Sequence, residues 1–130
     1  MGSPKQLAAV AVGGSLGSLL RVGLGEWIPV GAGLPWPTLL ANIVGSAVLG
    51  ALVALPRKDE DLRLPLLGIG FCGGLTTFSA LCWELFDLLD KGSAGTALAY
   101  ASVSLVMGLG AAVAANRFTL QAIAAEEAPS

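Results

Sequence analysis

The chain carries four long apolar stretches separated by short polar segments. They cover residues 6–24, 36–55, 64–89 and 94–115, and charged residues occur only near the ends of the first and third. About 20 apolar residues, each adding about 1.5 Å to a helix, cross the bilayer core of about 30 Å. The pattern therefore predicts an all-α, polytopic membrane protein with four transmembrane helices, in a single domain over residues 1–130.

Glycines and hydroxyl side chains interrupt the third stretch at bilayer depth, where residues 70–79 read GFCGGLTTFS. The adjacent Gly73 and Gly74 favour unwinding, which frees backbone carbonyls that lipid cannot satisfy. In broken membrane helices such carbonyls hold cations, and half-helix N-termini face anions. We therefore predict a third helix that is broken at mid-span beside an ion site. A kink that only improves packing is the simpler alternative.

Other polar side chains lie inside the apolar stretches. Asn42 is an amide in the uncharged second stretch, where it can hold a neighbouring helix or donate to a desolvated anion. Tyr100 and Ser104 are four residues apart, so they share one helix face and can form a line of donors. Arg21 and Glu84 lie near helix ends, where each can act on an ion path or simply reach the membrane interface.

Composition agrees with a membrane protein and excludes other classes. Hydrophobic residues make up 55% of the chain and charged residues 12%, about half the share typical of soluble domains. The net charge of −2 excludes a basic surface for nucleic acid. The high hydrophobic share makes the lipid bilayer the expected surroundings. The chain has no histidine, and its short connections leave no room for a soluble domain. We therefore expect a function inside the membrane and no enzymatic activity.

Small residues at helical spacing predict close helix contacts. Gly13 and Gly17 in the first stretch, and Ala41 and Gly45 in the second, are each four residues apart. Such pairs let helix backbones approach closely, either within one subunit or between subunits. Because four spans cannot easily enclose a pathway, we expect the chain to form an oligomer.

Three blocks of sequence together resemble the fluoride channel family (Fluc, also called CrcB-type fluoride exporters). They are GGxxGxxxR over residues 13–21, TLxxNxxG over 38–45 and GGLTTFS over 73–79. The resemblance covers residues 9–117 and is carried mainly by the third block. It implies a passive, fluoride-selective channel in the cell membrane that exports fluoride from the cytoplasm.

The resemblance also implies an assembly and a cofactor. Family members form antiparallel dimers with two pores, each lined by both subunits, and a structural sodium ion lies at the dimer centre. In this chain the backbone carbonyls of Gly73 and Thr76 match the sodium ligands. Phe78 matches a pore phenylalanine, whose ring edge carries positive charge toward an anion. Asn42 matches the pore amide.

The remaining site residues follow from the same resemblance. Arg21 and Glu84 match charges that we assign to the pore mouths. The fluoride path is further lined by hydroxyl side chains, which are those of Thr77, Ser79, Tyr100 and Ser104.

Two positions depart from the family pattern. Leu81 stands where the family has a second pore phenylalanine, and Gly108 stands where a serine often continues the hydroxyl track. Leu81 offers no ring edge to an anion. The dimer is therefore either a homodimer or a heterodimer in which an oppositely oriented homologue supplies the missing ring.

The distribution of cations predicts one orientation in the membrane. Arg21 and Lys91 flank one face, and the other face has five cations, which are Lys5, Arg57, Lys58, Arg63 and Arg117. The positive-inside rule places the richer face, with both termini, in the cytoplasm.

Two other functions are alternatives for a small four-span protein. A proton-coupled multidrug-type antiporter needs a carboxylate within the membrane, and Glu84 near a span end is a poor match. The chain can also be a non-conducting partner subunit of a heterodimeric fluoride channel.

Overall fold

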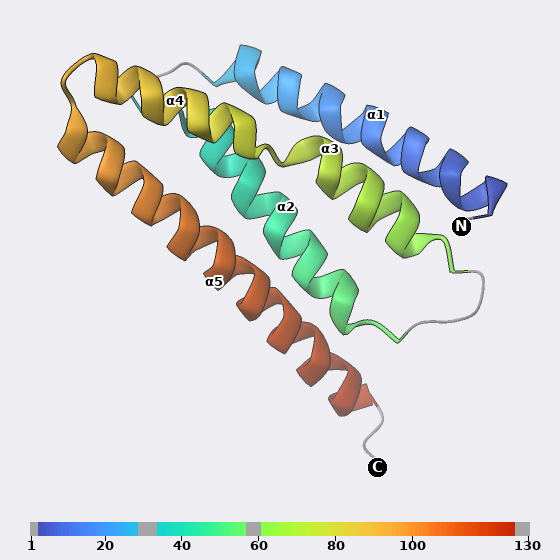
Figure 1. Cartoon of the computed structure of the whole chain (residues 1–130). Coiled ribbons are helices and arrows are strands. Elements are labelled where there is room, and N and C mark those ends of the chain that lie inside the picture. The colour runs from blue at the N-terminus through green and yellow to red at the C-terminus, as the bar shows by residue number, and fades with distance from the viewer. Residues whose placement is uncertain (1–2, 29–33, 57–60, 127–130) are drawn as a thin grey trace.

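The computed structural model describes residues 3–28, 34–56 and 61–126. Within these residues, four helical segments are long and apolar enough to cross a membrane, and no strand occurs, which confirms the all-α prediction. The first, second and last segments are single helices, and the third is divided into three parts. In chain order the elements are α1 (Pro4–Trp27), α2 (Trp36–Ala54), the π-helix η1 (Leu64–Cys72), α3 (Gly73–Leu75), α4 (Phe78–Asp90) and α5 (Ala94–Glu126) (Figure 1).

The helix ends follow local sequence signals, with one exception. Ser3 and Gln6 form a capping box at the start of α1, with Ser3 N–H donating to Gln6 Oε1 at 2.9 Å. α5 continues to Glu126, well beyond residue 115, where the fourth predicted stretch ends. Residues 111–126 contain no glycine or proline, and most of them are good helix formers.

The four spans pair in two sets. α1 packs mainly on η1 and α3, whereas α2 packs mainly on α5 (Figure 1). The third span changes neighbours at its break, because its second half, α4, packs on α5. The N- and C-terminal ends lie at the same end of the bundle (Figure 1). An even number of spans requires this arrangement.

The small residues predicted to mediate close contacts do so within this chain. A Cβ atom on Gly13 would lie 1.9 Å from the carbonyl oxygen of Leu66, and one on Gly17 would lie 2.1 Å from that of Phe71. A Cβ on Gly45 would lie 2.3 Å from the Thr76 methyl group. These motifs therefore bind the spans of one subunit to each other, which is the simpler of the two alternatives.

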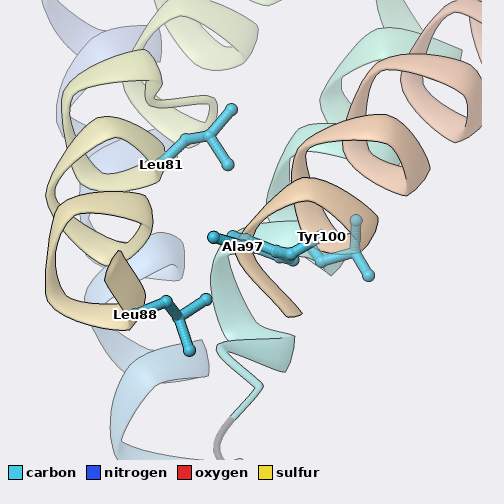
Figure 2. Packing of buried hydrophobic residues seen from close by; sticks show 5 residues of the cluster. Leu81, Leu88, Ala97 and Tyr100 are labelled. Atoms are coloured by element: carbon cyan, nitrogen blue, oxygen red, sulfur yellow. The ribbon is translucent and has the colours of Figure 1, made fainter. Parts of the chain in front are cut away.

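A cluster of buried apolar side chains holds α4 on α5. Leu81 and Leu88 extend from α4 toward Ala97 and Tyr100 of α5 (Figure 2). Leu39 of α2 completes the cluster, and each member is less than 9% exposed. The cluster fixes the second half of the third span, and with it the position of the break.

Candidate functional site

The third span is broken at mid-length, one helical turn later than predicted. α3 ends at Leu75 and α4 begins at Phe78, and between them Thr76 and Thr77 are extended, with ψ angles of 151° and 120°. Gly73 remains helical, so the expectation that the glycines themselves unwind is wrong. The break at mid-span is confirmed, and its extended residues are the two threonines.

The glycine before the break serves close packing instead of unwinding. A Cβ atom on Gly74 would lie 2.3 Å from the carbonyl oxygen of Gly14 in α1, so no larger residue fits there. The start of α4 is set by Thr77, whose Oγ1 accepts a hydrogen bond from Ala80 N–H at 3.2 Å. Threonine is a favoured residue for capping a helix N-terminus, and here it starts α4.

Asn42 of α2 holds the broken backbone. Its Oδ1 accepts a hydrogen bond from Thr77 N–H at 2.8 Å, and its Nδ2 donates to Thr77 O at 3.2 Å. Both polar groups of one extended residue are thus satisfied by a single amide, where lipid offers no partner. An amide has two N–H groups, so one donor of Asn42 is left after these contacts.

The Cys72 carbonyl ties Thr76 back to the first half of the span. Thr76 N–H and Thr76 Oγ1 both donate to Cys72 O, at 2.9 Å and 2.8 Å. The Thr76 methyl group lies against Gly45 of α2. Thr76 is therefore held on its backbone and on its side chain.

The other carbonyls at the break differ in the hydrogen bonds that they accept. Arg21 Nε donates to Gly74 O at 3.1 Å. In the described part of the chain, no hydrogen bond reaches the carbonyls of Gly73 and Thr76. Within the described residues, the carbonyl of Leu75 likewise has no such hydrogen bond. The family resemblance assigns two of these carbonyls, those of Gly73 and Thr76, to a cation, and that assignment stays a prediction.

A groove of about 980 Å³ runs along the break, bordered by α2, η1, α4 and α5. No charged side chain lines it within the described residues. Phe78 forms part of its edge and is 75% exposed. The other predicted residues on its wall are Asn42, Gly73, Thr76, Thr77 and Ser104.

Ser104 of α5 lies on the wall of this groove. The residue is buried, and among the described residues its Oγ makes no hydrogen bond. Ser46 also lines the groove and was not predicted. Its signal was its position four residues after Asn42, on the same face of α2.

The remaining predicted residues lie away from the groove. Ser79 is exposed, and its Oγ is 3.2 Å from Thr77 Oγ1. Tyr100 donates to Glu84 Oε2 at 2.7 Å, while Thr38 donates to Glu84 Oε1. Glu84 therefore joins α4 to α2 and α5. Neither Glu84 nor Arg21 lines the groove, and a pore-mouth role for them stays a prediction.

The groove is lined mainly by apolar residues, and the polar groups among them are uncharged amide and hydroxyl groups. An amide N–H, hydroxyl groups and an aromatic edge can replace the water around a small anion without holding it as a fixed charge would. The described residues contain no cluster of histidine, cysteine or carboxylate side chains that could hold a metal ion. The fold and this groove define a small polytopic membrane protein with an ion-compatible path along a broken helix.

Comparison with known proteins places the chain in a family. Residues 8–116 match the family model described as CrcB-like protein, Camphor Resistance (CrcB), and the chain belongs to this family. It is 48% identical over 105 residues to a protein of Thermus thermophilus named fluoride-specific ion channel FluC, covering 77% of this chain and 82% of that protein. The protein of the same name from Leptospira interrogans is 40% identical over 120 residues, which cover 88% of this chain and 94% of that protein.

Proposed function

We propose that this chain is a subunit of a passive, fluoride-selective channel that releases fluoride from the cytoplasm across the cell membrane. The observation that carries the proposal is the uncharged groove at the helix break, with the remaining donor of Asn42 and the residue Ser104 on its wall. The names of the relatives agree with this function.

Fluoride is small and strongly hydrated, so a pore that passes it must replace its water shell. Asn42, Thr77 and Ser104 supply N–H and O–H groups, and Phe78 supplies a positive ring edge. Proton-coupled antiport is less favoured, because both oxygens of Glu84 already accept hydrogen bonds from Thr38 and Tyr100. Flow is then driven by the electrochemical gradient alone.

The working unit in this proposal is an antiparallel dimer. The groove is open along one side, and both Gly73 and Phe78 are exposed there. A second subunit placed over that side would close the path and bury the phenylalanine ring. The carbonyls of Gly73 and Thr76 would then hold a structural sodium ion between the subunits, and the freed backbone oxygens would coordinate it.

The function is tested by fluoride efflux from liposomes that contain the purified protein. We expect rapid release of fluoride, measured with a fluoride electrode, and no comparable release of chloride from matched liposomes. Equal release of both ions, or none of either, would overturn the proposal.

The sodium site predicts different outcomes for two substitutions. A Cβ atom on Gly73 meets nothing within 4 Å in a single chain, so the Cβ atom of Gly73→Val has room in this subunit, and the side chain adds bulk where the ion is expected. Thr76→Ser keeps the backbone carbonyl and the hydroxyl that donates to Cys72 O. We therefore expect Gly73→Val to lose fluoride efflux and Thr76→Ser to keep most of it. Equal efflux in both variants, or full activity of the natural protein after sodium is replaced by a bulky organic cation, contradicts the site.

The cation distribution predicts a single orientation with cytoplasmic termini. Lys5 lies in the first turn of α1, Arg63 directly before η1 and Arg117 in the last third of α5, while Arg57 and Lys58 lie outside the described residues. The start of α1 and the end of α5 lie at the same end of the bundle (Figure 1). We expect a C-terminal tag on the chain, expressed alone, to be inaccessible from outside intact cells. A large outward-facing population would support a homodimer.

A single orientation would favour a heterodimer, since an antiparallel pore then needs an oppositely inserted homologue. Leu81 supports the same interpretation, because its aliphatic side chain is buried against α5 and lines the groove without a ring edge. In that assembly the partner would supply the second aromatic ring, and this chain would conduct only together with it.

A further inference from the structure

Arg21 is connected to the helix break through a single contact. It lies on α1, and its Nε donates to the carbonyl oxygen of Gly74, 53 positions away in the chain. The two ion pairs among the described residues are Arg63–Asp61 and Lys91–Asp87, so no described carboxylate pairs with Arg21. Arg21 does not line the groove. Its structural link to the ion site therefore runs through the backbone of Gly74.

The backbone of Gly74 packs closely on Gly14 of α1, but among the described residues only Arg21 donates a hydrogen bond to its carbonyl. Gly73 and Gly74 are adjacent, and glycine places few limits on its own backbone dihedral angles. A Cβ atom on Gly73 would meet nothing within 4 Å, so no group restrains that residue on its Cβ side. On the C-terminal side of Gly74, the N–H and the side chain of Thr76 donate to Cys72 O. Arg21 supplies the corresponding anchor before the break.

We propose that Arg21 is a positioning residue that fixes the peptide of Gly74, and thereby orients the neighbouring Gly73 and Thr76 carbonyls for a cation. The sodium part of this inference rests on the proposed function, whereas the anchoring of the break does not. The donor of Arg21 carries this role and its positive charge does not, because a guanidinium ion close to a cation site repels the cation.

The donor and the charge can be separated by one substitution. The Nε2 atom of glutamine is bonded to Cδ, as the Nε atom of arginine is, so Arg21→Gln keeps an N–H donor at the same place and removes the charge. Arg21→Met removes both. Arg21→Lys keeps the charge and moves the donor one bond further out, which makes it the matched control for charge.

The first measurement is amide hydrogen exchange of the peptide spanning residues 72–81, in the full-length protein in detergent. We expect Arg21→Met to exchange faster than the natural protein there, and Arg21→Gln to match the natural protein. The second measurement is the sodium concentration that half-maximally raises the thermal unfolding midpoint. It should rise about tenfold or more in Arg21→Met, the size typical when a residue that orients a metal ligand is lost, and should not rise in Arg21→Gln.

The outcomes separate this inference from the proposed function. Arg21→Gln behaving like Arg21→Met, while Arg21→Lys matches the natural protein, would show that the charge matters and would overturn the positioning role. If Arg21→Met does not fold, faster exchange in Arg21→Gln than in the natural protein overturns it equally. Absence of fluoride efflux from the natural protein would refute the channel but would leave the exchange result to decide on Arg21.

Discussion

Asn42→Asp is expected to lower fluoride efflux by about 100-fold or more. The new carboxylate would lie in the groove, where two unit charges about 4 Å apart repel by about 4 kcal/mol at an effective dielectric constant of about 20. Each 1.4 kcal/mol is about a tenfold change, which allows for a loss of this size even if the repulsion is partly relieved. The substitution also replaces the Nδ2 donor to Thr77 O by an oxygen that faces a carbonyl. The measurement is the initial rate of efflux from liposomes.

Asn116→Asp is the matched control for this experiment. Asn116 is also a partly buried amide, and its Nδ2 donates to the Gly50 carbonyl at 3.1 Å, but it does not line the groove. The control thus loses the same kind of hydrogen bond between an amide and a backbone carbonyl. We expect its efflux to stay close to that of the natural protein. An equal fall in both variants would mean that loss of stability, not repulsion of the anion, explains the result for Asn42.

The spans could be predicted from sequence because hydrophobic length alone decides whether a helix crosses a bilayer. The predicted limits of the second span, 36–55, differ from Trp36–Ala54 by one residue at most. The end of the last helix was missed by about three turns, since the hydrophobic pattern marks where the membrane ends and not where the helix does. Residues 116–126 are polar enough to leave the membrane and still prefer a helix.

The break was predicted, but its position depends on contacts between distant residues. Glycine propensity points to Gly73 and Gly74, yet both are helical, and the extended residues are those that Asn42 and Cys72 can hold. Local propensity is a weak guide wherever tertiary hydrogen bonds are available. Asn42 itself was recognisable, because an amide in an apolar span must have a polar partner.

The role of Arg21 could not be read from the sequence. A cation near the end of a span can be accommodated in several ways. Only the packing of α1 on α3 brings Arg21 Nε to Gly74 O. Glu84 is a similar case, since its partners Thr38 and Tyr100 come from two other spans. Both charged residues were found as candidates, and both are held by hydrogen bonds that span 16 or more positions.

The largest effect on stability is expected from the smallest substitution, Gly13→Ala. The added Cβ atom would lie 1.9 Å from Leu66 O and 2.9 Å from Phe71 N, so the α1 and η1 backbones must separate. Backbone atoms cannot rotate out of the way as side chains do. Overpacking of a core costs about 1–3 kcal/mol, and a clash with backbone belongs at or above the upper end of that range. We expect a clear fall in the thermal unfolding midpoint and in the yield of monodisperse protein.

Gly14→Ala is the control that makes this prediction specific, because it is the same substitution one residue along the same helix. Its Cβ atom would have Gly70 O as its nearest neighbour, at 3.8 Å, which is an ordinary contact. Alanine is a better helix former than glycine by about 1 kcal/mol, so the midpoint should be unchanged or slightly raised. If Gly13→Ala is as stable as Gly14→Ala, then α1 does not approach η1 as closely as the structure has it. An unfolding midpoint clearly lower in Gly13→Ala than in Gly14→Ala would show that α1 and the first half of the third span pack as one rigid unit. Arg21 can hold the break against that unit.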